Sequence, residues 1–421
     1  MQLIDIQKLQ FSDKDAAEAR LLEFLKAHED PAINHVELRP KPESLNSLNG
    51  FVSYSDGERL FFKTHVEENE QLSEYYNATM LAKAGYPVVA AKQISHRPGK
   101  QIVLYEILSY PTLFDLLKEE EDAQLAGAPQ SNRAKALLAA QGRLDSTVFG
   151  IYRQTLQKRT ADASEPPIYQ LFYHRLNENG RFGLFYKGKS MPFNGAELEF
   201  DKLAQMHWTI NGVKYSDTLD EMVKRSRLLL RPANELAVVG HGDAHNGNIF
   251  VDEDTMALNM FDPAFAGLHD PMLDLTKPLF HNIFARWMYF PEQVSHEFEI
   301  DAKIVGNEII VEHNYFPSKL RLAHLAAKKE NLLKPTRDLL RDLAKAAKDE
   351  FDSHWREYLH ASLFCCPFLT VNLFAPAVAN GTLAERYGLS IKLLGLATAV
   401  SLGSLTHTGE NNLTGILDDI F

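Results

Sequence analysis

The chain has few cysteines: its 421 residues include two, Cys365 and Cys366, which are neighbours in the sequence. Neighbouring cysteines rarely form a disulfide with each other, and two thiolates are too few for a metal site. We therefore expect both to be buried in a protein of a reducing compartment. The N-terminal stretch MQLIDIQKLQFSDKD lacks the basic and the apolar regions of a secretory signal. These absences predict a cytoplasmic protein.

Long hydrophobic runs are missing as well. The stretch 361–379 is interrupted by Pro367, Asn372 and Pro376, and the stretch 391–405 is too short to cross about 30 Å of hydrocarbon. Both are expected to be buried helices, and no contact with a membrane is predicted.

Positive charge is not in excess. The formal net charge is -12, with 44 Lys and Arg against 56 Asp and Glu. Binding to nucleic acid depends on neutralising phosphates with Lys and Arg, so a nucleic-acid partner is not expected. The acidic balance slightly favours an amine-bearing small molecule as a ligand. Nothing in the sequence indicates an oligomeric state.

The domain organisation changes near residue 108. Before it, strand-like runs rich in aromatic and β-branched residues surround one helical segment, and Asp56-Gly57 marks a hairpin turn. After it, helical patterns dominate, while the irregular stretch 119–200 and a possible hairpin in 295–315 are interpreted as insertions. Single cores rarely grow beyond roughly 250–300 residues. We predict a small lobe of strands with an N-terminal helical extension, residues 1–108, and a larger, mainly helical lobe, residues 109–421.

Polar side chains are concentrated in HGDAHNGNIF, residues 241–250, directly after an apolar strand-like run. Asp243 in a tight loop after a strand can orient an incoming hydroxyl or accept its proton. Asn248 can bring its carbonyl oxygen to a metal ion, and His241 can hold the loop by bonding backbone groups. The pattern favours a catalytic loop.

A second acidic loop follows at the right distance. The segment FDPAFAGLHDPMLDL comes after a strand–turn–strand pattern and places Asp262 at the end of the second strand. Mg²⁺ prefers oxygen ligands from one or two carboxylates together with substrate phosphates. Asp243 as base, with Asn248 and Asp262 as metal ligands, is the arrangement that phosphoryl transfer requires. The alternative is a pair of loops whose polar side chains satisfy only local backbone groups.

These motifs resemble the aminoglycoside phosphotransferase and choline kinase family, whose fold is similar to that of protein kinases. The family pattern H-G-D-x-x-x-x-N is matched by residues 241–248, and its metal-binding aspartate by Asp262. The resemblance implies that Asp274 packs beneath the catalytic loop and that His207, in LAQMHW, is structural. It also implies an α+β, two-lobed kinase-like fold and an enzyme that uses ATP and Mg²⁺ to phosphorylate a hydroxyl of a small molecule.

The small lobe offers the groups that such an enzyme needs to hold ATP. A kinase-like lobe places a lysine on a strand against the α- and β-phosphates and a helical carboxylate beside that lysine. Lys63 in RLFFKTH and Glu74 in the following helix are matched to these roles by the resemblance. The alternatives are a solvent-facing strand lysine and an exposed helical glutamate.

The segments expected to cover the phosphates and to face the adenine resemble the family less specifically. The segment SLNGFVSY offers Gly50 for a loop that covers the phosphates, although the chain has no G-x-G-x-x-G. In VLYEILSY, backbone groups around Glu106 and Leu108 are expected to face the adenine. An ordinary edge strand would have a similar sequence.

Two other functional classes stay open. A protein kinase is disfavoured because the H-R-D and D-F-G triplets are missing. A non-catalytic nucleotide-binding module is disfavoured because Lys63, Asp243, Asn248 and Asp262 are all present. His245 could donate to the transferred phosphate or only pack the loop, and loop packing is the favoured interpretation.

Overall fold

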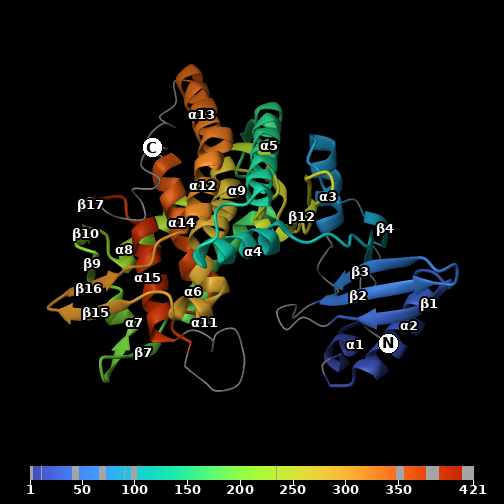
Figure 1. Ribbon diagram of the computed structural model, residues 1–421, viewed down its shortest axis with the longest axis horizontal. Helices are drawn as coiled ribbons and strands as arrows, with labels where there is room; N and C mark the ends of the chain where they lie inside the picture. The colour runs from blue at the N-terminus through green and yellow to red at the C-terminus, as the bar shows by residue number, and fades with distance from the viewer. Residues whose placement is uncertain are drawn as a thin grey trace. The chain divides into compact units, whose positions relative to one another are not determined.

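The computed structural model separates into two compact units (Figure 1). The first unit comprises residues 1–111 and 250–264, and the second comprises 112–249 and 265–421. The hairpin after the catalytic loop therefore groups with the N-terminal residues, whereas the sequence assigned it to the larger lobe. The structure describes residues 3–10, 12–39, 47–65, 73–89, 91–95, 102–233, 235–347, 355–375 and 388–409.

The first unit is built on a five-stranded antiparallel sheet with strand order β1-β2-β3-β5-β4. Figure 1 shows helices α1 and α2 on one side of this sheet and α3 on the other. The hairpin β12–β13 joins the unit through hydrogen bonds of Met260 with Pro87 and Val89. The strands are β1 (Ile33–Leu38), β2 (Ser47–Tyr54), β3 (Arg59–His65), β4 (Ala91–Ser95), β5 (Ile102–Glu106), β12 (Ile249–Asp252) and β13 (Ala257–Met260); the helices are α1 (Leu3–Leu9), α2 (Lys14–His28) and α3 (Ser73–Ala84).

Strand alternation decides which way Lys63 points. Leu60 and Phe62 of β3 are buried in the core that α1 and α2 share with the sheet. Successive side chains of a strand point to opposite faces, so Lys63 lies on the other face. The predicted hairpin turn between β2 and β3 is confirmed, with Gly57 at a φ of 91° that favours glycine.

Gly50 does not lie in a phosphate-covering loop. The structure places SLNGFVSY in strand β2, where Gly50 pairs with Leu38 of β1. A Cβ at this position would lie 2.1 Å from the carbonyl oxygen of Glu37, so the close approach of β1 accounts for the glycine. The loop prediction for this segment is wrong, because aromatic and β-branched residues there favour a strand. The residues that connect β1 to β2 are 39–46, and 40–46 lie outside the described part of the chain.

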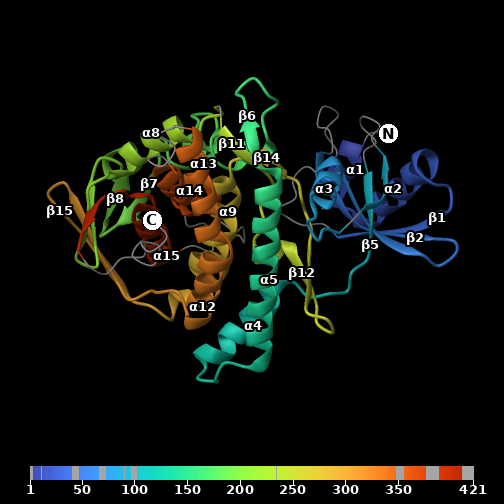
Figure 2. The same cartoon turned by 90° about the horizontal axis from the view of Figure 1, so that it is seen from above.

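The second unit is mainly helical, as predicted. Helix α14 packs against α8, α9 and α15, and α5 packs against β11 and α12; Figure 2 shows α5 along its length. Its helices are α4 (Leu113–Leu125), α5 (Asn132–Thr155), α6 (Arg181–Phe185), α7 (Phe200–Leu203), α8 (Leu219–Leu229), α9 (Pro271–Leu279), α10 (Arg286–Tyr289), α11 (Pro291–Ser295), α12 (Lys319–Lys328), α13 (Lys334–Ala347), α14 (Trp355–Thr370) and α15 (Leu389–Gly403). The short turns are η1 (Pro167–Leu171), η2 (His174–Leu176), η3 (Asn246–Asn248), and the π-helical η4 (Phe280–Phe284) and η5 (Lys329–Leu333).

Three small sheets complete the second unit, in the orders β15-β16-β9-β10-β17, β14-β11-β6 and β7-β8. The hairpin predicted within 295–315 is confirmed as β15–β16, which turns at Gly306. The strands are β6 (Gln157–Arg159), β7 (Ser190–Phe193), β8 (Ala196–Glu199), β9 (His207–Ile210), β10 (Val213–Tyr215), β11 (Glu235–Gly240), β14 (Gly267–His269), β15 (Ile300–Val305), β16 (Glu308–His313) and β17 (His407–Thr408).

The stretch 119–200 is not an irregular insertion at its start. Residues 132–155 form α5, a helix of 24 residues whose N-cap Ser131 accepts a hydrogen bond from the Ala134 N–H. Its face with Leu137, Leu144 and Ile151 is buried, so this helix is part of the core of the unit. The interpretation as an insertion failed here because charged residues on the outer face of the helix interrupt the apolar pattern.

Both cysteines are buried on α14, in agreement with the prediction. Burial raises the pKa of each thiol, so both are neutral near pH 7. Within the described residues, no helix combines the length and the apolar character needed to cross a membrane. The predicted α+β class, with a small strand-rich part and a larger helical part, is confirmed, although the five-stranded sheet of the small part is antiparallel and not mixed.

Candidate active site

The predicted catalytic loop closes on itself after β11. The side-chain amide of Asn248 donates to the backbone oxygen of Asp243 at 2.9 Å, and the Asp243 N–H faces His241 Nδ1 at 3.4 Å. His245 caps the turn η3, since its Nδ1 accepts from the Gly247 N–H at 3.1 Å. The structure therefore gives His245 the loop-packing role, and Asp243 and Asn248 are brought together in the second unit.

Asp274 anchors this loop from below, as the family resemblance implied. Its carboxylate accepts hydrogen bonds from the Gly242 N–H and the Tyr152 hydroxyl, and His269 Nε2 lies 3.2 Å from Oδ1. Burial acts to raise the pKa of Asp274, but the bonds from His269, Tyr152 and Gly242 hold the pKa below its usual value. Asp274 is therefore an ionised, fully bonded anchor.

Two glycines allow the loop to approach this anchor. A Cβ on Gly240 would lie 2.5 Å from His269 Nε2 and 2.7 Å from the Asp274 carboxyl carbon. Gly242 has a φ of 81°, and a Cβ there would lie 2.2 Å from the backbone oxygen of Phe265. Larger residues at either position would displace the loop.

The Asp243 carboxylate is held without strong hydrogen bonds. Its Oδ1 is buried and has no hydrogen-bond partner among the described residues. The nearest cationic groups are Lys277 Nζ at 3.9 Å from Oδ1 and His245 Nε2 at 3.9 Å from Oδ2. An orphaned buried oxygen of this kind is unusual and is often completed by a ligand. The carboxylate is therefore available to a hydroxyl group.

Lys277 stands on α9, three residues after Asp274, and is buried. Its Nζ lies 3.1 Å from His281 Nε2, and the Tyr289 hydroxyl lies 2.7 Å from His281 Nδ1. Burial lowers the pKa of Lys277, and burial together with the charge of Lys277 lowers that of His281 well below its usual value. His281 is thus a neutral acceptor for the lysine.

Two arginines add positive charge near Lys277. Arg181 Nη1 donates to the backbone oxygens of Leu369 and Thr370, each at 3.0 Å. Arg175 is half-buried in η2 and interacts electrostatically with Arg181 and Asp243. Burial and the charge of Arg181 lower the pKa of Arg175 to about 10.

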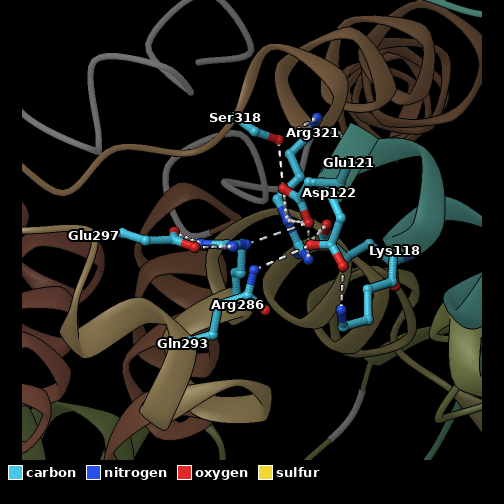
Figure 3. Close-up of polar contacts among 9 residues, drawn as sticks. Lys118, Glu121, Asp122, Arg286, Gln293, Glu297, Ser318 and Arg321 are labelled. Atoms are coloured by element: carbon cyan, nitrogen blue, oxygen red, sulfur yellow. Dashed lines mark hydrogen bonds and ion pairs between the residues drawn. The ribbon is translucent and has the colours of Figure 1, made fainter. Parts of the chain in front are cut away.

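A buried ion network lies at the other side of the loop (Figure 3). The Glu121 carboxylate of α4 accepts three hydrogen bonds from Arg321, from Nε to Oε1 at 2.8 Å and to Oε2 at 3.1 Å and from Nη2 to Oε2 at 2.9 Å. Ser318 donates to the same carboxylate. Arg286 Nε lies 3.6 Å from Glu121 and also pairs with Glu297. Bidentate pairing of this kind fixes α4 against α12.

The network reaches the catalytic loop through η4. Arg321 Nη1 donates to the backbone oxygen of Asn282 at 2.8 Å, and the side-chain oxygen of Asn282 accepts from the Asn246 N–H at 2.9 Å. A cavity of about 20 Å³ lies among these groups. Three buried atoms of residues lining it lack a partner among the described residues, namely Asn246 Oδ1, Asn282 Nδ2 and His324 Nε2. This volume and polarity suit one water molecule.

The first unit brings Lys63 and Asp262 together. Lys63 Nζ lies 3.1 Å from Asp262 Oδ1. Asp262 has a φ of 54°, a left-handed conformation that a non-glycine residue rarely adopts and that is often found at functional sites. The Asn77 side chain donates to the backbone oxygen of Pro263 at 3.2 Å and so connects α3 to the segment after Asp262. Glu74 lies in the first turn of α3, and its side chain is outside the described part.

A larger cavity, of about 370 Å³, lies in the first unit. It is lined by Val89, Ala91, Lys92, Glu106, Leu108 and Asn259. Glu106 and Leu108, which the sequence assigned to the adenine, both line it. Within the described residues no cluster of three or more His, Cys, Asp or Glu side chains could by itself hold a metal ion.

Several residues of these sites were not predicted. Tyr152, Arg175, Asn282 and Arg321 lie far from the loop in sequence, and no local pattern marks them. Lys277 did carry a signal, because it is a charged residue at the i+3 position from Asp274 in an otherwise apolar helix. His207 begins β9 and is exposed there.

Comparison with known proteins agrees with these observations. Residues 186–299, which include the catalytic loop, Asp262 and Asp274, match the family model APH, described as "Phosphotransferase enzyme family". The resemblance and the predicted phosphotransferase class are confirmed by this match. No curated protein sequence matches the chain.

Solved structures of phosphotransferases are also similar. A macrolide 2'-phosphotransferase from Brachybacterium faecium is 14% identical, with 82% of this chain and 97% of that chain covered and a TM-score of 0.36. A glucosamine kinase is 13% identical, with 89% and 78% covered and a TM-score of 0.43. An ethanolamine kinase from Plasmodium vivax is 10% identical, with 96% and 94% covered and a TM-score of 0.42. At these identities and TM-scores, the similarities identify no acceptor.

Proposed function

We propose that this protein transfers the γ-phosphate of ATP, with Mg²⁺, to a hydroxyl group of a small molecule in the cytoplasm. The observation that carries the proposal is the Asp243 carboxylate, which sits on a rigidly anchored loop with one buried oxygen left unbonded. The family match over residues 186–299 supports the same reaction class.

Asp243 acts on the acceptor hydroxyl. Its free carboxylate oxygen orients the O–H group and takes its proton as the oxygen–phosphorus bond forms. The bond between the γ-phosphorus and the bridging oxygen of ADP breaks, and ADP leaves with the electron pair. A positioned base of this kind contributes about 10²- to 10⁴-fold to the rate. Most of the remaining acceleration comes from positioning and from neutralisation of charge.

The first unit supplies the nucleotide site in this proposal. Lys63 holds the α- and β-phosphates, and Glu74 orients it in the presence of nucleotide. The cavity of about 370 Å³ takes the adenine, against backbone groups around Glu106 and Leu108. Its volume falls in the usual range for a small-molecule site.

Asn248 and Asp262 are the residues that would hold Mg²⁺. A carboxylate and an amide oxygen are ligand types that this hard cation takes together with nucleotide phosphates. The Asn248 amide nitrogen is turned to the Asp243 backbone, which directs the carbonyl oxygen away from the loop. Bound there, the ion would neutralise charge on the phosphates.

The test is a phosphate-transfer screen with Mg-ATP against sugars, aminoglycosides, amino alcohols, amino acids, nucleosides and a protein substrate. We expect turnover of at least one small molecule. Asp243→Ala should keep ATP binding and lower turnover by about 10²- to 10⁴-fold. Asp262→Ala should instead weaken the binding of Mg-ATP, measured by calorimetry.

Four results would contradict the proposal. Near-wild-type turnover in Asp243→Ala would remove its base role, and unchanged Mg-ATP affinity in Asp262→Ala would remove the metal role. Turnover of the protein substrate alone would identify a protein kinase. Mg-ATP binding without any turnover would identify a non-catalytic module.

A further inference from the structure

The surroundings of Asp243 in the second unit carry more positive than negative charge. Lys277, Arg175 and Arg181 are the cations, and Asp243 is the carboxylate that acts most strongly on both Lys277 and Arg175. The thiol of Cys366 also acts on both cations and that of Cys365 on Arg175. Both thiols stay neutral near pH 7 because burial raises their pKa. Three cations therefore lie near one another, since Arg181 acts on both Lys277 and Arg175.

A cluster of buried cations is costly without a ligand. A buried charge is normally paired, because removing it from water costs several kcal/mol unless an opposite charge replaces the solvent. Lys277 is 5% exposed, and its hydrogen-bond partner is the neutral His281. Its distance of 3.9 Å to Asp243 is too long for a hydrogen bond.

The two arginines differ in their hydrogen-bond acceptors. Arg181 already donates to the carbonyls at the end of α14. The Arg175 guanidinium has no hydrogen-bond acceptor among the described residues, and its planar fork suits a carboxylate or phosphate. Arg175 and Lys277 thus offer donors to an anion beside the carboxylate that faces the acceptor hydroxyl.

We propose that the acceptor carries an anionic group, a carboxylate or a phosphate, which Arg175 and Lys277 bind beside Asp243. The inference rests on the proposed function and narrows its substrate class to hydroxylated acids. It differs from the expectation drawn from the net charge of -12, which slightly favoured an amine. Charge at the site, and not the sum over the chain, decides which ligand is attracted.

The same cations could instead serve the phosphate that is being transferred. In that case they would bind the γ-phosphate of the nucleotide and be filled whenever ATP is bound. The two sources of anionic oxygen are separable, because ADP leaves the γ-phosphate position empty and a non-hydrolysable ATP analogue fills it.

Sulfate is a suitable probe, since it is doubly charged and needs no turnover. Its binding is measured by titration calorimetry at constant ionic strength, with sodium chloride as the balancing salt. We expect saturable binding to the wild type and a dissociation constant about 10- to 100-fold weaker in Arg175→Gln and in Lys277→Met, the range for loss of a charge-assisted hydrogen bond. Arg153→Gln, which alters an exposed arginine of α5, is the matched control and should bind as the wild type does.

Sulfate titrations with bound nucleotide test whether the anion belongs to the acceptor or to the nucleotide. Sulfate should bind equally well in the presence of Mg-ADP and of the non-hydrolysable Mg-ATP analogue. Binding that survives Mg-ADP but is lost with the analogue would assign the cations to the γ-phosphate and overturn the proposal. Absence of saturable sulfate binding, or equal affinity in all four proteins, would overturn it as well.

Three compounds on one carbon skeleton then test the chemical class. Gluconate should displace sulfate, whereas glucose and glucosamine should not. Displacement by glucosamine or glucose that equals that by gluconate would contradict the inference. These experiments measure binding and not turnover. A failure of the proposed phosphotransfer would appear in the phosphate-transfer screen and would leave the binding result unchanged.

Stability distinguishes a binding role from a structural one. Lys277→Met removes a buried charge whose ion pair with Asp243 is long, at 3.9 Å, so we expect an unfolding temperature no lower than that of the wild type. If Lys277→Met does not fold, the loss of sulfate affinity in Arg175→Gln still tests the proposal, because Arg175 is half-buried.

Discussion

Replacing Asp274 should damage both the stability of the second unit and its catalysis. The carboxylate is 3% exposed and accepts hydrogen bonds from Gly242, Tyr152 and His269. In Asp274→Ala these three buried donors lose their acceptor, at about 1–3 kcal/mol each. We expect a loss of about 4–6 kcal/mol, a large part of the 5–15 kcal/mol that usually stabilises a domain. Turnover should fall as well, since the Gly242 N–H no longer fixes the loop that carries Asp243.

Graded variants separate the contributions. Tyr152→Phe removes one charge-assisted bond and should cost about 1.5–3 kcal/mol, and Asp274→Asn should cost less than alanine because its amide keeps the shape and one acceptor. In a double-mutant cycle, Tyr152→Phe and Asp274→Asn should be coupled by about 1 kcal/mol or more, since the two side chains are in contact. Asp301→Asn, on the exposed face of β15, is the control and should stay within about 0.5 kcal/mol of the wild type.

The measurement is urea unfolding followed by tryptophan fluorescence, which reports on this unit because Trp208 and Trp287 are fully buried in it. A free energy of unfolding for Asp274→Ala within about 1 kcal/mol of the wild type would refute the reasoning, because three buried donors without an acceptor should destabilise the fold by more than that. Additive effects of Tyr152→Phe and Asp274→Asn would show that the two residues do not act as one anchor.

Further variants test other parts of the structure. Asp270 is buried at the N-cap of α9, and burial and the nearby Glu235 raise its pKa to about 8. The folded state therefore binds a proton that the unfolded state releases near pH 4, so this contribution to stability is lost as the pH rises towards 8. Denaturation at pH 6 and pH 8 should show a loss of about 2 kcal/mol that is absent in Asp270→Asn; an identical pH dependence in both proteins would contradict the assignment. Glu121→Ala leaves Arg321 buried without its partner and should cost about 3–5 kcal/mol, whereas its exposed neighbour Glu119, changed to alanine, should cost less than about 1 kcal/mol. Lys63→Met should weaken ATP binding about 10- to 100-fold in calorimetry, with Lys83→Met on the exposed side of α3 as control; equal affinities would remove the phosphate role of Lys63.

Features encoded locally could be predicted from the sequence. The hairpins β2–β3, β12–β13 and β15–β16 each have turn residues between runs of β-branched or aromatic residues, and all three are present. The closure of the 241–248 loop also depends on neighbours, because Asn248 and His245 bond to backbone groups within five residues. Local chemistry of this kind is visible in one short stretch.

Features that depend on packing between distant segments could not be predicted from the sequence. Gly50 was expected in a loop that covers the phosphates, yet its lack of a side chain allows the close approach of β1, which the sequence of one strand does not reveal. Tyr152 meets Asp274 across 122 positions, and Glu121 meets Arg321 across 200. Pairs of this kind form only when helices from distant segments pack together, and one sequence holds no trace of such partners.

The catalytic loop is therefore fixed from two sides by networks of different character. Beneath it, Asp274 is satisfied by three donors and leaves no free charge. Beside it, Lys277 faces Asp243 at a distance that no direct bond bridges. A protein that needed only rigidity would have joined these two groups by a direct hydrogen bond, since a buried charge in a long ion pair is costly. The gap is what a ligand would fill: its hydroxyl would complete Asp243, and an acidic group on the same molecule would complete Lys277 and Arg175. On this argument, the residues that the fold leaves unsatisfied define the substrate more closely than the family pattern does.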